Sequence, residues 1–193
     1  MSKNAERPTE GKLIIISSPS GGGKGTVIKR LLELHPELCY SVSATTRAPR
    51  EKEICGVSYD FISRERFLEM IDNDEFLEYA KYVDEYYGTP KKNIEEALKA
   101  GKNIILEIEV QGAKQVKKLM PDALSIFIVP PSLEELERRL RGRGTDSEEK
   151  LVARLDRARH ELGEKIHYAH TVINDEVDRA VEEILSIITK QDK

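Results

Sequence analysis

The sequence has no tryptophan and only two cysteines among its 193 residues. Two cysteines cannot build a framework of disulfides, so the chain must rely on an ordinary buried core, for which its length is sufficient. No apolar segment approaches the length that crosses a membrane, and the polar tail formed by residues 1–11 lacks the apolar stretch of a signal peptide. We therefore expect a single-domain cytoplasmic protein with no membrane partner.

The sequence also lacks an excess of positive charge. Its formal net charge is −4, whereas proteins that bind DNA or RNA usually carry a broad basic surface, so we expect no nucleic-acid partner. Aromatic residues make up only 6% of the chain, while charged residues reach 34%. This composition is typical of amphipathic helices that pack on a sheet of aliphatic strands.

A glycine-rich segment follows the first apolar run. Residues 13–16 lead directly into SSPSGGGKGT and then into helix-like periodicity. A strand, a loop whose glycines let backbone N–H groups turn inward, a lysine and a helix start together form a cradle for a polyphosphate. A plain turn is the alternative, but a lysine at a helix start is unfavourable unless an anion binds there. The residues of this P-loop expected to bind ATP are Ser20, Gly21, Gly22, Gly23, Lys24, Gly25 and Thr26.

The P-loop departs from the general pattern GxxxxGK[ST] at two positions. Ser18 replaces the first glycine, and Gly25 replaces the Ser or Thr whose hydroxyl usually meets Mg²⁺. Thr26 lies about 100° further around the helix, which makes it a poor substitute. We therefore expect Mg²⁺ as a cofactor that is held mainly by phosphates and water, and we predict no protein ligand for it. His167 and His170 are interpreted as surface residues rather than metal ligands.

Apolar and amphipathic segments alternate along the chain. A polar segment at residues 44–61 is expected to be a binding loop, and EYYGTP at residues 85–90 is interpreted as a turn because it contains glycine and proline. The alternation predicts an α/β fold with a parallel sheet, helices on both faces, and ligands at the carboxyl ends of the strands. Strands are expected at 13–16, 39–43, 76–83, 103–110, 123–131 and 171–175, and helices at 27–34, 63–74, 90–101, 112–120, 132–140, 150–165 and 176–190.

The polar segment contains a candidate second anion site. Arg47 and Arg50 stand three residues apart around Pro49, which favours extended backbone before it, so both guanidinium groups could converge on one phosphate. Tyr59 and Tyr87 could add phenolic donors. Taken alone, the two arginines would be better interpreted as part of a solvated loop.

The chain resembles guanylate kinases through SVSATTRAPR, GVSYDF, FLEYAKYVDEYYGTP, LEIEVQG and RLRGRGTDSEEKLVARL, over residues 12–188. The resemblance implies an enzyme that transfers the γ-phosphoryl group of ATP to GMP, and also to dGMP, in purine nucleotide metabolism. It implies a core of residues 12–43 and 94–190 that carries the P-loop, a GMP-binding region at 44–93 and a lid at 138–150. It also implies a GMP pocket lined by Ser43, Arg47, Arg50, Glu53, Tyr59, Glu78, Tyr87, Thr89, Glu107 and Glu109.

Glu78 is the residue that we expect to select guanine. Its carboxylate can accept both the N1–H and the 2-amino group of guanine, and the hydroxyls of Ser43 and Thr89 can meet the remaining acceptor. Adenine lacks that pair of donors, so it would leave polar groups in the site unpaired. The alternative is an exposed strand carboxylate opposite Lys81.

An arginine-rich segment stands out in this acidic chain. Its glycines permit movement, so it could close over ATP and bring arginines onto the transferring phosphoryl group. The nucleophile would be an oxygen of the GMP phosphate, which is largely ionised near neutral pH, so no general base is needed. The expected catalytic residues are Lys24, Arg139, Arg143 and Arg154, whereas a solvated helix face is preferred for Arg138, Arg141 and Arg157.

Two other functions remain open from the sequence. One is a noncatalytic module with a similar scaffold that binds a peptide at the GMP site, against which Lys24 and the arginine lid argue. The other is a kinase of the same architecture that acts on another phosphorylated acceptor, since a P-loop alone does not define the acceptor. Glu78 and the two tyrosines favour guanine. The sequence gives no indication of the oligomeric state.

Overall fold

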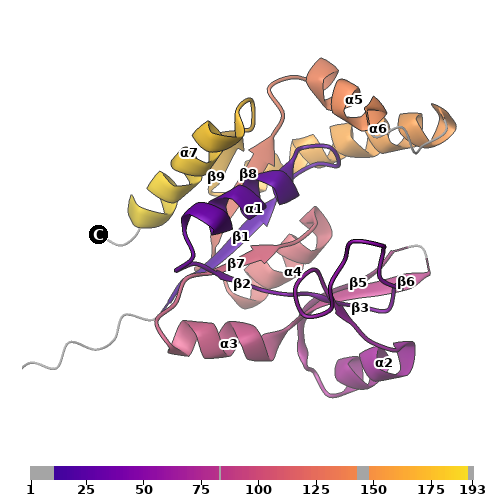
Figure 1. Ribbon diagram of the computed structural model, residues 1–193, viewed down its shortest axis with the longest axis vertical. Helices are drawn as coiled ribbons and strands as arrows, with labels where there is room; N and C mark the ends of the chain where they lie inside the picture. Colours follow the sequence, from indigo (N-terminus) through magenta and orange to yellow (C-terminus); the bar gives the residue numbers. More distant parts are fainter. Residues whose placement is uncertain (1–10, 83, 143–147, 191–193) are drawn as a thin grey trace, which may run out of the picture.

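A computed structural model of the chain describes residues 11–82, 84–142 and 148–190 (Figure 1). Its centre is a five-stranded sheet in which every neighbouring pair of strands is parallel. This arrangement confirms the predicted α/β fold with a parallel sheet. In spatial order the strands are β2 (Cys39–Tyr40), β7 (Ile104–Glu107), β1 (Leu13–Ser17), β8 (Leu124–Val129) and β9 (His170–Ile173).

Helices cover both faces of the central sheet, as Figure 1 shows. Successive side chains of a strand point to opposite faces, so Ile14 and Ile16 of β1 enter one buried cluster while Leu13 and Ile15 enter another. Strands with two covered faces are apolar throughout, and all six residues of β8 are buried. The first cluster lies under α1 (Lys24–Leu34) and α7 (Val177–Lys190), and the second under α3 (Lys91–Lys99) and α4 (Val110–Leu119).

A second, four-stranded sheet lies beside the first, in the order β4-β3-β6-β5. Its core is aromatic, and the rings of Phe67 and Phe76 stack with their centroids 4.4 Å apart. The elements are β3 (Ala44–Thr45), β4 (Asp60–Phe61), α2 (Arg64–Asp72), β5 (Phe76–Tyr82) and β6 (Glu85–Pro90).

Two predictions about this region are wrong. Residues 85–90 form strand β6, not a turn, because they pair with both β5 and β3. The glycine serves packing instead: a Cβ on Gly88 would lie 2.9 Å from the ring of Phe76. The strand predicted at 39–43 ends at Tyr40, because the chain leaves the central sheet there and pairs next in β3.

The remaining helices are α5 (Leu133–Arg141) and α6 (Glu148–Gly163), followed by a short 3-10 helix (Glu164–His167). Ser132 caps α5, because its Oγ accepts from the backbone N–H of Glu135 at 3.2 Å. Figure 1 shows α5 and α6 near the loop that joins β1 to α1. Within the described ranges, no helix is long and apolar enough to span a bilayer.

Candidate active site

The P-loop leaves β1 at the carboxyl end of the central sheet and ends at α1. Gly21 and Gly23 have φ angles of 84° and 86°, in the left-handed region that side chains disfavour. A Cβ on Gly23 would also lie 2.2 Å from Nδ2 of Asn174. The two glycines therefore let the backbone turn in a way that other residues would strain, as the loop pattern predicted.

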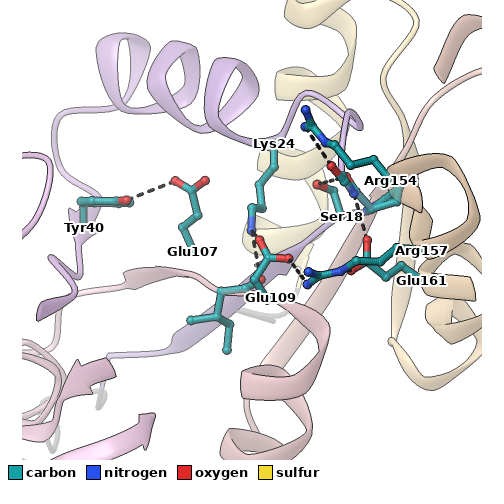
Figure 2. A network of polar contacts seen from close by, with 11 residues as sticks. Ser18, Lys24, Tyr40, Glu107, Glu109, Arg154, Arg157 and Glu161 are labelled. Atoms are coloured by element: carbon teal, nitrogen blue, oxygen red, sulfur yellow. Dashed lines mark hydrogen bonds and ion pairs between the residues drawn. The ribbon is translucent and has the colours of Figure 1, made fainter. Parts of the chain in front are cut away.

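Lys24 is the first residue of α1, and its side chain is almost fully buried. Its Nζ donates to the carbonyl oxygen of Ile108 at 3.1 Å and to Oε1 of Glu109 at 3.3 Å (Figure 2). Both partners follow the end of β7, so the ammonium group lies between the P-loop and the carboxyl edge of the sheet. A cation at this point would meet the phosphates of a nucleotide in the loop.

Glu107 ends β7 next to the helix start. Its Oε2 accepts from the hydroxyl of Tyr40 at 3.1 Å, and burial together with this carboxylate raises the pKa of Tyr40 (Figure 2). Its Oε1 would lie 3.7 Å from a Cβ built on Gly25. Among the described residues no group of three or more His, Cys, Asp or Glu side chains could hold a metal ion. The Glu107 carboxylate beside Gly25 is an oxygen ligand of the type that Mg²⁺ prefers.

Glu78 of β5 is 7% exposed and accepts from the hydroxyl of Thr89 at 2.6 Å. The interpretation of Glu78 as an exposed strand carboxylate is therefore wrong. Burial raises its pKa, an effect that Thr89 and the positive charge of Lys24 oppose. The carboxylate lies against α4, where a Cβ on Gly112 would be 2.6 Å from Oε2. The predicted base reader thus lies where the second sheet meets the core.

The predicted phosphate site in residues 44–61 is organised around Glu53. Nη2 of Arg47 donates to both Glu53 oxygens at 2.9 Å, and the backbone N–H of Arg50 donates to Oε2 at 2.8 Å. These donors lower the pKa of Glu53. The Arg47 guanidinium also lies over the Tyr59 ring, 5.7 Å from its centroid, and that ring meets Tyr87 edge-on.

The other predicted members of this site make fewer side-chain contacts than Arg47 and Glu53 do. Arg50 is exposed, so the structure brings Arg47 and Arg50 to one carboxylate but does not show both guanidinium groups on a common point. Ser43 is half-buried, and its backbone carbonyl accepts from the N–H of Asp60 at 2.9 Å. Glu53 therefore acts as a partner of Arg47 here, and its role as a GMP ligand stays a prediction.

Two of the predicted catalytic arginines contact the P-loop or its supports. Nη2 of Arg154 donates to the Ser20 hydroxyl at 3.2 Å. Arg139 donates to Glu135 at 2.8 Å and to the backbone oxygen of Asn174 at 2.9 Å. Arg143 lies outside the described residues, as does the middle of the predicted lid.

The three arginines assigned to a solvated helix face differ from one another. Arg138 and Arg141 are exposed and pair with glutamates on α5 and at the start of α6, as a surface face would. Arg157 is exposed as well, and in addition its Nε donates to the buried Glu161 at 2.7 Å and its Nη2 is 3.8 Å from Glu109. The predicted exposure therefore holds for Arg157, and the structure adds its contacts with Glu161 and Glu109.

Sequence reasoning missed two buried polar residues beside the P-loop. Asn174, which follows β9, donates from Nδ2 to the carbonyl oxygen of Gly22 at 2.9 Å and is 3% exposed. Glu161 accepts from the backbone N–H of Ser20 at 3.0 Å and is 7% exposed. A signal existed for Glu161, because it continues the helical spacing of the buried residues Leu155 and Ala158.

Comparisons with known proteins agree with this arrangement. A family model described as guanylate kinase matches residues 10–191. The chain belongs to the guanylate kinase family. This membership confirms the resemblance seen in the sequence motifs, and it covers the P-loop, the second sheet and the α5–α6 pair together.

Individual members of the guanylate kinase family show how far the similarity extends. A guanylate kinase of Trichormus variabilis is 51% identical over 179 residues, which are 93% of this chain and 90% of that protein. A guanylate kinase of Caldanaerobacter subterraneus is also 51% identical, over 93% of this chain and 87% of its own length. The crystal structure of guanylate kinase from Anaplasma phagocytophilum superposes with a TM-score of 0.78 at 34% identity, covering 95% of this chain and 87% of that one.

Proposed function

We propose that this protein transfers the γ-phosphoryl group of ATP to GMP, and also to dGMP, in purine nucleotide metabolism of the cytoplasm. The family supports GMP phosphorylation by ATP in general. The observation that carries the assignment in this chain is the buried pair of Glu78 and Thr89, within electrostatic reach of Lys24 in the P-loop. A carboxylate in that place suits the two adjacent donors of guanine.

The donor nucleotide would bind with its phosphates in the P-loop. Backbone N–H groups at the start of α1 and the ammonium group of Lys24 supply fixed positive charge for the β- and γ-phosphates. Mg²⁺ bound to ATP oxygens and water would add charge there, with Glu107 as the carboxylate beside it. Lys24 would then exchange its contact with Glu109 for the phosphates, which is possible because the Glu109 side chain is 60% exposed.

The acceptor nucleotide would lie across the second sheet. Its base would contact Glu78, Thr89 and Ser43, and its phosphate would reach the arginine and tyrosine side chains of the 44–93 region. Arg47 is already ordered by Glu53 and by the carbonyl oxygen of Ala48, so binding a phosphate would cost it little further ordering. The phosphate ligands assigned to this half of the site are Arg47, Arg50, Tyr59 and Tyr87.

Phosphoryl transfer needs the two nucleotides to be aligned and their negative charge to be neutralised, and it needs no proton acceptor. An oxygen of the GMP phosphate forms a bond to the γ-phosphorus of ATP, and the bond from that phosphorus to the β-γ bridging oxygen breaks, giving GDP and ADP. Lys24, Arg139 and Arg154 would stabilise the negative charge that develops on the equatorial oxygens of the transferring phosphoryl group. Arg143 is predicted to take part in the same step.

ADP formation measured with a panel of acceptors tests this proposal. The purified protein would be supplied with ATP and Mg²⁺ and, in turn, with GMP, dGMP, AMP, CMP and UMP. We expect rapid turnover with GMP, slower or equal turnover with dGMP, and little with the others, because only guanine fits the Glu78 pair. Equal turnover with AMP would assign the chain to another acceptor, and no ADP with any acceptor would favour a noncatalytic binding module.

A further inference from the structure

Glu161 is a buried carboxylate that the proposed transfer does not itself use. It lies near the end of α6, and both its oxygens are engaged: Oε2 accepts from the backbone N–H of Ser20 at 3.0 Å, and Oε1 accepts from Nε of Arg157 at 2.7 Å (Figure 2). Carboxylates are almost never buried unless they are paired, since removal from water is costly. The buried charge of Glu161 is therefore paired with the Arg157 guanidinium, and its second oxygen holds the backbone of the P-loop.

Arg154 approaches the same P-loop residue from the same helix face. It stands seven residues before Glu161, which is close to two helical turns, and its Nη2 donates to the Ser20 hydroxyl at 3.2 Å. Helix α6 thus holds Ser20 at both its backbone and its side chain. The two contacts join residues that are 141 and 134 positions apart in the sequence, so they fix how one distant helix lies on the loop.

The apolar packing of α6 would not fix this placement alone. Leu151, Leu155 and Ala158 pack on α5 in a cluster that is separate from the two clusters covering the central sheet. Leu162 of α6 also packs on the buried cluster that contains Phe127 of β8, but apolar contacts are not directional and leave α6 able to turn or slide by a small amount. Polar contacts at Ser20 are directional and oppose such a shift.

We propose that Glu161 is a positioning residue: it anchors α6 to the P-loop so that the Arg154 guanidinium lies over the transferring phosphoryl group. This inference rests on the proposed phosphoryl transfer. A displacement of about 1 Å in a group that neutralises transition-state charge costs a large part of its effect. The anchor would therefore act on turnover, through Arg154, and not on recognition of the acceptor base, which lies in the second sheet.

A carboxylate is required at position 161 because its two oxygens accept from two donors at once, the backbone N–H of Ser20 and Nε of Arg157. In Glu161→Gln one oxygen becomes an NH₂ group, which can accept from neither Ser20 nor Arg157, so only one of the two contacts survives. Glu161→Ala loses both. We expect kcat to fall about tenfold in Glu161→Ala and less in Glu161→Gln, with the KM for GMP unchanged in both.

A double-mutant cycle with Arg154→Ala tests whether Glu161 acts through that arginine. If it does, Glu161→Ala lowers kcat about tenfold in the wild-type background but less than about twofold when Arg154 is already absent. The same loss in both backgrounds would overturn the proposal, as would a rise in the KM for GMP equal to the fall in kcat. Glu161→Gln provides the same cycle if the alanine variant fails to fold.

Glu183→Ala is the matched control, because it removes the same charge from an exposed position on α7 and should leave kcat unchanged. Assays would be run below the thermal unfolding midpoint of every variant. Wild-type activity separates the two proposals: an inactive wild type refutes the proposed function, whereas an active wild type with an additive cycle refutes only the role of Glu161.

Discussion

The P-loop and the GMP-binding region are built in different ways. The polar side chains that fix the P-loop are buried and come from elements far apart in the sequence: Lys24 meets Ile108, Asn174 meets Gly22, and Glu161 holds the loop backbone. In the GMP-binding region the arginines of residues 44–61 are half-buried or exposed, and their partner Glu53 lies only a few residues away.

This difference indicates how each half meets its ligand. The P-loop and its partners form the donor half, where ATP is proposed to bind, and residues 44–93 form the acceptor half. The donor half is assembled by the folding of the central sheet, so its geometry exists before a nucleotide binds. The acceptor half has one preformed element, the Glu78–Thr89 pair, beside a loop held by local contacts and by strands of two residues. Substitutions in the P-loop should therefore stop transfer, whereas substitutions in the GMP-binding region should change which acceptor is used and how tightly it binds.

The largest effect is expected from Lys24→Ala, which removes the fixed charge of the donor half. Turnover should fall about 1,000-fold in a coupled ADP assay, because no other described side chain donates from this position. Lys29→Ala is the control, since Lys29 lies on the same helix with its side chain 80% exposed. Turnover of Lys24→Ala within a few-fold of wild type would show that the P-loop does not carry the transfer.

Glu78→Ala should alter selectivity more than turnover. The preference for GMP over AMP, measured as the ratio of their kcat/KM values, should fall about 100-fold, because guanine loses its charged acceptor and adenine loses a mismatched one. Lys81→Ala, at an exposed position of the same strand, is the control. An unchanged ratio would remove Glu78 as the base reader and weaken the division between the two halves.

Glu78 should also make stability depend on pH. Its pKa in the folded protein is raised above 4.5 by burial, so the folded state binds more protons than the unfolded chain in the interval above that value. Its contribution to stability therefore falls as pH rises from about 4.5 through the raised pKa. In Glu78→Gln, the thermal unfolding midpoint should gain relative to wild type as the pH rises above about 4.5. Parallel pH profiles would contradict this.

The smallest effect is expected at Cys55, which is exposed in the acceptor half. Bound GMP should order residues 44–61 and slow the labelling of Cys55 by a thiol reagent a few-fold. Cys39→Ser leaves Cys55 as the only thiol and makes the rate easy to assign. Equal labelling rates with and without GMP would mean that the loop around Cys55 does not close on the ligand.

The same contrast explains what the sequence predicted well. The central sheet was predictable because strands such as β1 and β8 are mostly aliphatic and buried, and the P-loop because its glycines and Lys24 are contiguous. Of the second sheet only β5 was predicted as a strand: β3 and β4 have two residues each, and the glycine in β6 was interpreted as a turn signal although it serves packing against Phe76.

Within the candidate site, the limit was long-range pairing. Glu78 and Thr89 were predicted together, and the structure joins them in adjacent strands. Asn174 and Glu161 were missed, because each stabilises a loop more than 140 residues away and nothing in the neighbouring sequence reveals that partner. Arg157 was predicted to be exposed, as it is, but its contact with the buried Glu161 was missed for the same reason.

Label transfer tests most directly whether these two halves hold a donor and an acceptor for one reaction. ATP labelled in its γ-phosphoryl group would be incubated with GMP, Mg²⁺ and the purified protein, and the products would be separated. The account predicts that the label appears in the β-phosphate of GDP, with one ADP formed per GDP. Label that remains in ATP, or that is released only as inorganic phosphate, would contradict it.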